Sequence, residues 1–103
     1  MAYNGGPMTE SMYYVLLALM DPNHGYGLMN TIEEVSKGRL KMGPGTLYGV
    51  LSRMVEDKLI ILKIDDGRRK TYEITKTGQE ALLQEYHRLF SLVDDGKILK
   101  GGV

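Results

Sequence analysis

The sequence contains no cysteine, no tryptophan and only one phenylalanine among its 103 residues. Without cysteine the chain forms neither a disulfide nor a thiolate metal site. No apolar run reaches the ~18 residues that a membrane-spanning helix needs, and the first residues lack the basic and then apolar pattern of a signal peptide. We therefore expect a cytoplasmic protein with a single domain and no membrane association.

Net charge is also lacking, because 13 basic and 13 acidic side chains cancel. The charges are nevertheless unevenly spread. Residues 1–36 hold four acidic side chains and no Lys or Arg, whereas residues 37–76 hold ten basic and five acidic ones. This asymmetry favours binding of an anionic partner at one end of the molecule. Chance clustering of charge is the alternative.

Two helices are predicted in the acidic segment. Thr9 is placed to cap the first, which contains the dense apolar run "SMYYVLLALM" of residues 11–20. The second extends over about residues 26–36, where apolar side chains recur every three or four positions, and Gly38 is a plausible stop. The first helix is apolar on nearly every face, so it needs more partner surface than a small domain easily offers.

A third helix is predicted to begin near Pro44, in the glycine-rich stretch "MGPGTLYGVL". Proline fits the first turn of a helix, because the N–H that it lacks has no partner there. Apolar residues of this helix share one face, and Gly45 and Gly49 lie on the other. The glycines remove side-chain bulk from that outer face, which permits a large partner to approach closely.

Two strands and a last helix complete the expected elements. The strands cover residues 59–65 and 70–75, with Gly67 in the turn between them. Thr75 then caps a helix from Lys76 to about Val93. A hairpin loop of three or five residues is preferred over a two-residue turn, because it gathers four apolar side chains on one face: Ile60, Leu62, Tyr72 and Ile74.

Three helices followed by a basic hairpin and a fourth helix predict a winged helix-turn-helix, mainly α with a small β-hairpin. We expect a flexible N-terminal arm over residues 1–7 and the DNA-binding domain over residues 8–75. A C-terminal dimerisation helix is expected over residues 76–95, and a flexible tail over residues 96–103. Surplus apolar surface on the first and last helices favours a two-fold homodimer.

Three stretches carry a resemblance to a known family: "LLALMDPNHGYGLMNTIEE", "MGPGTLYGVLSRMVEDKLI" and "GRRKTYEITKTGQEAL". Between about Val15 and Leu83 the sequence resembles the PadR family of winged-helix transcriptional regulators, and its short C-terminal part is similar to the subgroup with a single helix there. The resemblance implies a homodimeric repressor, often released by a small molecule. The chain departs from the family pattern at Gly43, where Ser or Thr is common, and at Gly49, where Pro is common.

The predicted DNA interface consists of the outer face and start of the third helix together with the tip of the wing. A solvated charged turn is the alternative for the wing, and a core position is the alternative for Tyr48, which the resemblance places at the DNA. The predicted DNA-binding residues are Lys41, Gly45, Thr46, Tyr48, Ser52, Arg53, Arg68, Arg69 and Lys70.

The predicted dimer interface lies along the first and last helices. Its members are Met12, Tyr13, Leu16, Leu82, Tyr86, Leu89, Phe90 and Val93. Aromatic and methionine side chains there could line a cavity for a flat aromatic effector, namely Met8, Met12, Tyr13, Tyr14, Tyr86 and Phe90. A plain dimer core is the alternative. His87 is expected at or near the same seam.

Other functions are less well supported. No metal site or cofactor is expected, because His24 and His87 are the only histidines and lack ligand spacing. His24 is expected to shape a turn, and Tyr26 belongs either to the core or to the DNA face. The glycine-rich stretch is no phosphate-binding loop of a nucleotide enzyme, since no Gly-Lys-Ser/Thr follows, so the chain is not expected to be an enzyme. A winged-helix module that binds only proteins is the second hypothesis.

Overall fold

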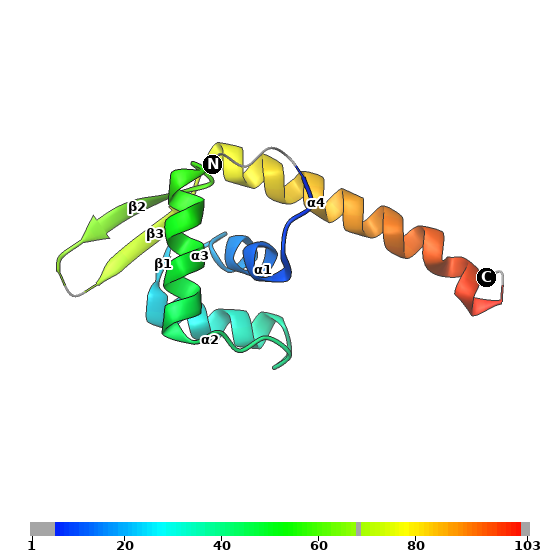
Figure 1. Cartoon of the computed structure of the whole chain (residues 1–103), viewed down its shortest axis with the longest axis horizontal. Helices are drawn as coiled ribbons and strands as arrows, with labels where there is room; N and C mark the ends of the chain where they lie inside the picture. Colours follow the sequence, from blue (N-terminus) through cyan, green and yellow to red (C-terminus); the bar gives the residue numbers. More distant parts are fainter. Residues whose placement is uncertain (1–5, 68, 102–103) are drawn as a thin grey trace.

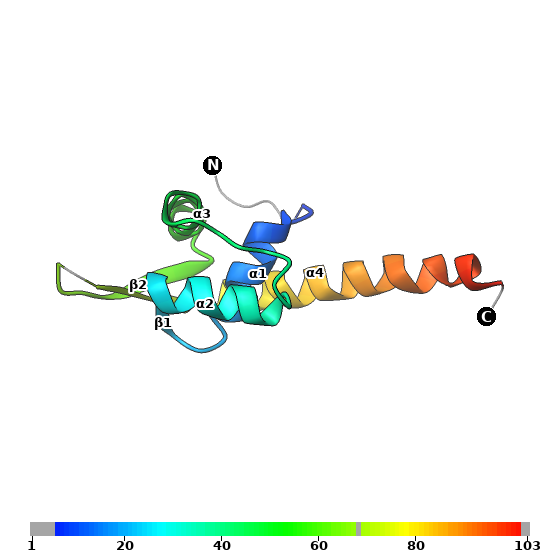
Figure 2. The ribbon, with the colours of Figure 1, turned by 90° about the horizontal axis from the view of Figure 1, so that it is seen from below.

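The computed structural model describes residues 6–67 and 69–101. The expectations for residues 1–5, Arg68 and residues 102–103 lie outside the described residues. A β-hairpin projects from one side of a small helical core, and the last helix projects from the opposite side (Figure 1), so the principal extents are 55 × 29 × 21 Å. Figure 2 looks almost along the third helix, which forms one edge of the molecule beside the hairpin.

The helices of the core begin and end close to the predicted positions. They are α1 (Glu10–Ala18), α2 (Gly25–Val35) and α3 (Pro44–Glu56). Thr9 caps α1, since its hydroxyl accepts a hydrogen bond from the Met12 N–H at 3.1 Å. Beyond α2, Gly38 has a φ of +79°, which glycine adopts without strain, and its N–H donates to the Glu33 carbonyl at 2.8 Å. The predicted cap and stop are therefore confirmed.

The sheet has one more strand than predicted. The two strands of the wing are β2 (Ile60–Asp65) and β3 (Lys70–Ile74), and the additional strand is β1 (Asn23–His24). The order is β1-β3-β2, with both pairs antiparallel. β1 contains only two residues, which is too short for an alternation of apolar and polar residues to predict it from the sequence. Its pairing ties the start of α2 to the wing.

The register at the base of the hairpin is the one preferred from the sequence. The pairs are Ile60 with Ile74 and Leu62 with Tyr72. Farther out, a β-bulge at Lys63 shifts the pairing by one residue. The loop between paired residues is therefore residues 66–69, four residues long, and the expected length of three or five is wrong. Gly67 has the predicted positive φ, at +86°.

One continuous core joins all four main helices to the base of the hairpin. Its most deeply buried side chains are Val15, Leu16, Leu19, Leu28, Ile32, Leu47, Leu51, Met54, Leu59 and Ile60. Each apolar side chain of this size contributes about 1.5–3 kcal/mol when it is removed from water.

A threonine and a glycine attach α4 (Lys76–Asp95) to the wing. The Thr75 hydroxyl accepts a hydrogen bond from the Gly78 N–H (2.9 Å) and donates to the Lys58 carbonyl (2.8 Å). A side chain at Gly78 would come within 3.0 Å of the Leu59 carbonyl carbon, so only glycine fits there. The helix ends where expected, before Gly96. Beyond it, the predicted irregular tail instead begins with a 3-10 helix, η1 (Gly96–Lys100).

Candidate nucleic-acid interface

The start of α3 leaves backbone N–H groups open. Gly43 is the N-cap, and it contributes no side-chain hydrogen bond to the first turn. Its carbonyl still accepts the hydrogen bond of the Leu47 N–H at 3.0 Å, so the helix begins regularly. The N–H groups of Gly45 and Thr46 belong to the first turn, where helix geometry supplies no acceptor. Both residues are exposed, so this helix end offers donors and a positive dipole to an anion.

The outer face of α3 is open, as predicted. A Cβ atom at Gly45 or Gly49 would meet nothing within 4 Å. Ser52 and Arg53 extend this exposed face toward the end of the helix. The opposite face is buried in the core by Leu47, Leu51 and Met54. α3 therefore packs one side against the core and presents to solvent a polar side with little side-chain bulk.

Tyr48 lies between the two faces and is 41% exposed. Its ring reaches Gly25, the first residue of α2: a Cβ atom at Gly25 would overlap the Tyr48 hydroxyl oxygen and lie 2.6 Å from Cζ. The "HGYG" turn and the "PGTLYG" helix are thus in direct contact. Sequence reasoning treated these two motifs separately and did not find this contact.

The wing presents basic side chains at its tip. Arg69 and Lys70 are exposed. The Arg69 N–H donates to the Asp66 carboxylate at 2.7 Å, and the Asp66 N–H donates back to the Arg69 carbonyl at 3.3 Å. These two hydrogen bonds close the turn and fix the backbone from which the basic side chains extend. Arg68, the remaining predicted wing residue, lies outside the described residues.

Two basic side chains near α3 already have acidic neighbours. The Lys41 ammonium lies 4.0 Å from the Glu33 carboxylate, and both groups are largely exposed. The Arg53 Nε lies 3.9 Å from Oδ2 of Asp57, one helical turn farther on. The Lys41–Glu33 pair is exposed on both sides, and such pairs contribute little to stability, so Lys41 is not held firmly and can exchange its partner for a phosphate.

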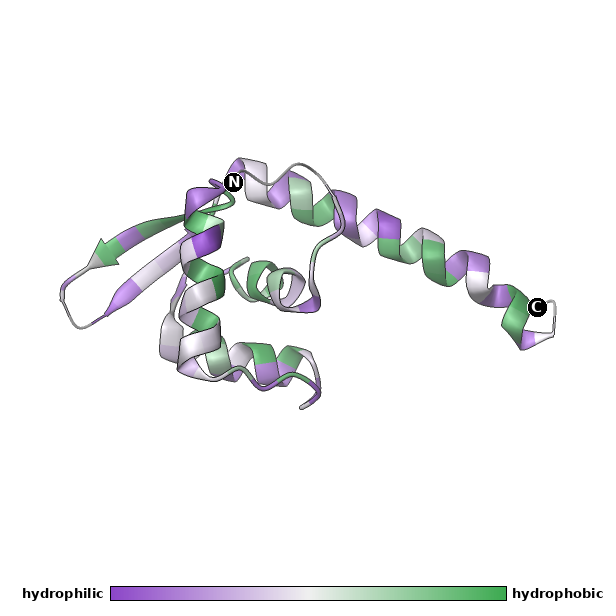
Figure 3. Cartoon of the chain, in the orientation of Figure 1, coloured by the Kyte–Doolittle hydropathy of each residue, from purple (hydrophilic) through white to green (hydrophobic). Residues whose placement is uncertain are grey.

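Apolar residues recur along α4, where Figure 3 shows several green segments, and some of them form an exposed stripe. Its exposed members are Leu83, Tyr86, Phe90 and Val93. Leu16 and Leu82, which were assigned to the dimer interface, are instead buried in the chain's own core. The spacing of Leu82 along the helix is that of a coiled-coil position, but its side chain faces the chain's own core. The neighbouring Leu83, which is absent from the predicted interface, faces solvent instead.

The remaining predicted interface residues are half-buried. Met12, Tyr13 and Leu89 are of this kind. His87 is exposed, and its ring lies edge-on to Tyr86 with 5.7 Å between centroids.

A buried carboxylate holds the segment before α1 against α4. Glu85 accepts a hydrogen bond from the Met8 N–H (3.1 Å) and two from the Arg88 guanidinium (2.8 and 2.6 Å). The Arg88 hydrogen bond lowers the pKa of Glu85 below its usual range; burial opposes this shift, and the Met8 N–H supports it. Glu85 is therefore ionised near neutral pH and joins two parts of the chain, α4 and the segment before α1.

Aromatic side chains gather where α1 meets α4. The rings of Tyr13 and Tyr14 lie edge-to-face with 6.0 Å between centroids, and those of Tyr86 and Phe90 are 6.3 Å apart. Burial raises the pKa of Tyr13, and the neighbouring Tyr86 and Glu85 raise it further. Tyr14 in turn accepts a hydrogen bond from Arg39, in the loop before α3.

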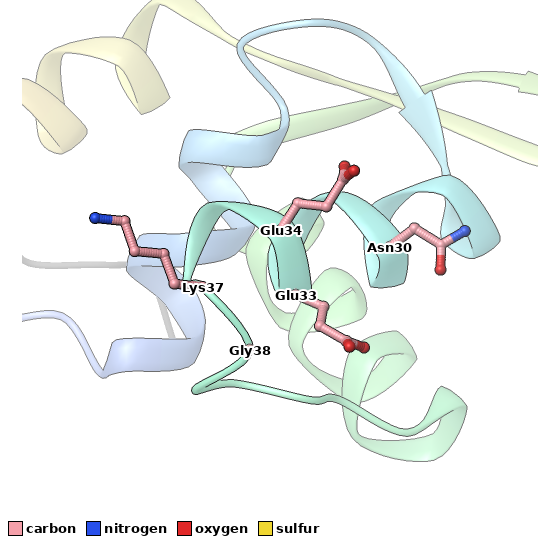
Figure 4. A pocket seen from close by; sticks show the side chains of 5 residues that line it. All are labelled: Asn30, Glu33, Glu34, Lys37 and Gly38. Atoms are coloured by element: carbon pink, nitrogen blue, oxygen red, sulfur yellow. The ribbon is translucent and has the colours of Figure 1, made fainter.

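A separate surface hollow lies at the end of α2 (Figure 4). Its lining residues are Asn30, Glu33, Glu34, Lys37 and Gly38. In Figure 4 the Lys37 side chain points away from Asn30 and Glu33, so these polar groups do not converge on one point. Small-molecule sites usually have a few convergent polar groups, and the lining of this hollow contains none of the residues predicted to bind an effector.

The sequence alone does not decide the roles of Tyr26 and His24. Tyr26 is 73% exposed, which excludes a core position in this chain. His24 belongs to β1, and its side chain lies outside the described part of the structure.

In the described ranges, no cluster of three or more His, Cys, Asp or Glu side chains is arranged to hold a metal ion. None of the helices in those ranges combines the length and apolar character needed to cross a bilayer.

Comparison with known proteins extends these observations. The chain is 37% identical over 95 residues to a 37.1 kDa protein of transposon TN4556 from Streptomyces fradiae, covering 91% of this chain and 26% of that protein. It is 32% identical over 62 residues to the transcriptional regulator YqjI of Escherichia coli, covering 60% of this chain and 30% of YqjI. The chain thus spans less than a third of the length of these relatives.

Solved structures agree with the fold. The crystal structure of a PadR family transcriptional regulator from Eggerthella lenta superimposes with a TM-score of 0.70 at 26% identity, covering 84% of this chain and 74% of that one. YqjI and the Eggerthella lenta protein are both named as transcriptional regulators. The sequence pattern of the PadR-like transcriptional regulator family matches residues 15–84, more than half of the sequence. The chain therefore belongs to the PadR-like family of transcriptional regulators.

Proposed function

We propose that this chain is a cytoplasmic, sequence-specific DNA-binding repressor that acts on a palindromic operator as a homodimer. The observation that carries the proposal is the open outer face of α3, cleared of side-chain bulk at Gly45 and Gly49 and continued by exposed basic residues. A helix of this shape fits the major groove. Zero net charge does not oppose the proposal, because the basic residues are concentrated around α3 and the wing.

The contacts divide into two kinds. Tyr48, Ser52 and Arg53 on α3 are assigned to base edges, since they lie on or beside its outer face. Backbone phosphates are assigned to the start of α3 and to the wing. The residues with this role are Lys41, Gly45, Thr46, Arg68, Arg69 and Lys70, of which Arg68 is assigned from the sequence alone. Phosphate contacts supply much of the affinity and make it depend steeply on salt.

The exposed stripe of α4 supports the dimer. Leu83, Tyr86, Phe90 and Val93 form an apolar surface that a second copy would cover. The stripe lies on the opposite side of the core from the wing (Figures 1 and 3), so pairing there leaves both α3 helices free. Two copies of α3 related by a two-fold axis would read half-sites one helical turn, or a multiple of it, apart.

The effector is proposed to bind where α1 meets α4. Tyr13 and Tyr14 form one aromatic pair on α1, Tyr86 and Phe90 form another on α4, and Met8 and Met12 belong to the core or pack against it. Such a surface suits a flat aromatic molecule, because aromatic rings stack and methionine adapts its shape. The ligand would loosen the hold of the core on α4 and so change the separation of the two α3 helices.

Selection of DNA from a random pool tests the main proposal. The full chain is expected to enrich a palindrome, and gel shifts at 50 and 200 mM salt are expected to show a steep loss of affinity. Removal of the wing charges by Arg68→Ala/Arg69→Ala is expected to weaken binding to all sequences and to flatten the salt dependence. Failure to enrich any sequence, together with salt-insensitive binding to a protein partner, would favour a protein-interaction module instead.

A further inference from the structure

We propose that Asp57 is a positioning residue that aims Arg53 at a guanine edge. This inference rests on the proposed DNA-binding function and adds to it a residue that does not itself touch DNA. Asp57 follows the last turn of α3, and its carboxylate Oδ2 lies 3.9 Å from the Arg53 Nε. Its side chain is 5% exposed, whereas that of Arg53 is 63% exposed.

Asp57 occupies its position at an energetic cost. Within the described residues, its Oδ1 atom is buried and accepts no hydrogen bond. Burial of a carboxylate with so few partners is unfavourable. The site is also the C-terminal end of a helix, where the dipole disfavours negative charge. A neutral residue of the same size would be expected to stabilise the free protein, so stability does not account for the carboxylate.

The geometry offers a reason for this cost. An arginine side chain has many rotamers, and fixing one of them on binding lowers affinity. The carboxylate attracts the Nε edge of Arg53 from beneath. The two terminal amino groups of the guanidinium then remain free to point outward, and together they match the O6 and N7 acceptors of guanine. Gly49, one turn before Arg53, has no side chain, so the outer face beside Arg53 carries little bulk.

For the operator affinity of Asp57→Asn, the positioning role predicts the opposite change from the one that charge alone predicts. Asp57→Asn removes a negative charge beside the DNA and keeps the shape of the side chain. Charge alone would therefore make the variant bind every DNA more tightly. If Asp57 positions Arg53, the variant instead binds non-specific DNA as well as or better than the parent, yet loses about 3- to 10-fold in operator affinity through the freed arginine rotamers.

A matched control is available on the same turn. Glu56 is exposed and adjacent in sequence, and no ion pair links it to Arg53 in the described structure. Glu56→Gln removes the same charge, and it is expected to leave the ratio of operator to non-specific affinity unchanged. Thermal unfolding of both variants checks that they fold, and Asp57→Asn is expected to be at least as stable as the parent.

A double-mutant cycle completes the test. Gel shifts compare the parent chain, Asp57→Asn, Arg53→Ala and the double variant on the selected operator and on a scrambled duplex. The expected result is that Asp57→Asn lowers operator affinity when Arg53 is present and has no such effect when it is absent. Additive effects, or a uniform loss on both duplexes, would overturn the positioning role. A parent chain that does not discriminate between the duplexes would overturn the proposed function itself.

Discussion

The Tyr48 ring lies against Gly25, so closely that a single added carbon at Gly25 would overlap the Tyr48 hydroxyl oxygen. The contact joins the first residue of α2 to the exposed face of α3. Gly25 also follows directly after β1, which pairs with the wing strand β3. The Tyr48 contact therefore connects α3 to the start of α2, and β1 connects the start of α2 to the wing, so the three elements that the proposed function brings to DNA are linked.

Gly25→Ala is expected to destabilise the fold by about 1–3 kcal/mol, the usual cost of overpacking. The added methyl group must displace the Tyr48 ring, because 2.6 Å to Cζ is far below van der Waals contact. Denaturant unfolding measures the change. The double variant Gly25→Ala/Tyr48→Ala is expected to recover part of the lost stability, and a lack of recovery would show that Tyr48 is not the obstacle.

Gly49→Ala is expected to have the opposite effect on stability. Nothing lies within 4 Å of a Cβ atom at Gly49, and alanine is a better helix former by about 1 kcal/mol. The same methyl group occupies the open outer face of α3, so operator affinity is expected to fall. Unfolding curves and gel shifts on one preparation check both halves of the prediction. A gain in stability without a loss of affinity would mean that DNA does not approach this face.

Periodicity and local motifs predicted the larger elements correctly, and the errors lie where tertiary contacts decide. Thr9, Pro44 and Thr75 marked the starts of helices because capping is a local interaction. The two-residue strand β1 forms only because β3 is available to pair with it. Likewise, helical spacing cannot distinguish Leu82 from Leu83, since the direction that faces the core depends on how α4 meets α1. The buried position of Asp57 leaves no signal in the sequence for the same reason.

Stability is expected to fall in acid because of Glu85. Its pKa is lowered in the folded protein, chiefly by the Arg88 hydrogen bond. A lowered pKa means that the stabilisation is complete above the pKa of the unfolded chain and is lost as pH falls through the lower, folded value. Thermal unfolding between pH 3 and pH 7 is therefore expected to show a decline that begins below about pH 4.5, the ordinary range of a glutamate.

Glu85→Gln separates this contribution from those of other acidic groups. The amide keeps the size of the side chain but cannot form charge-assisted hydrogen bonds with Arg88. Loss of this charge is expected to cost about 1.5–3 kcal/mol at pH 7 and to flatten the decline in acid. An equally steep acid profile in the variant would assign the decline to other carboxylates.

Phe90→Asp is expected to break the proposed dimer without unfolding the chain. Phe90 lies in the middle of the exposed stripe of α4, so the charge is harmless in a monomer but would be buried in a dimer. Sedimentation velocity is expected to give a dimer for the parent and a monomer for the variant. Gln84→Asp places the same charge on the same helix, about a third of a turn away from Phe90, and is expected to remain dimeric. If both variants keep the parent's mass, the stripe is not the interface, whereas a variant that is monomeric but still binds the full palindrome tightly would show that pairing along α4 does not set half-site spacing.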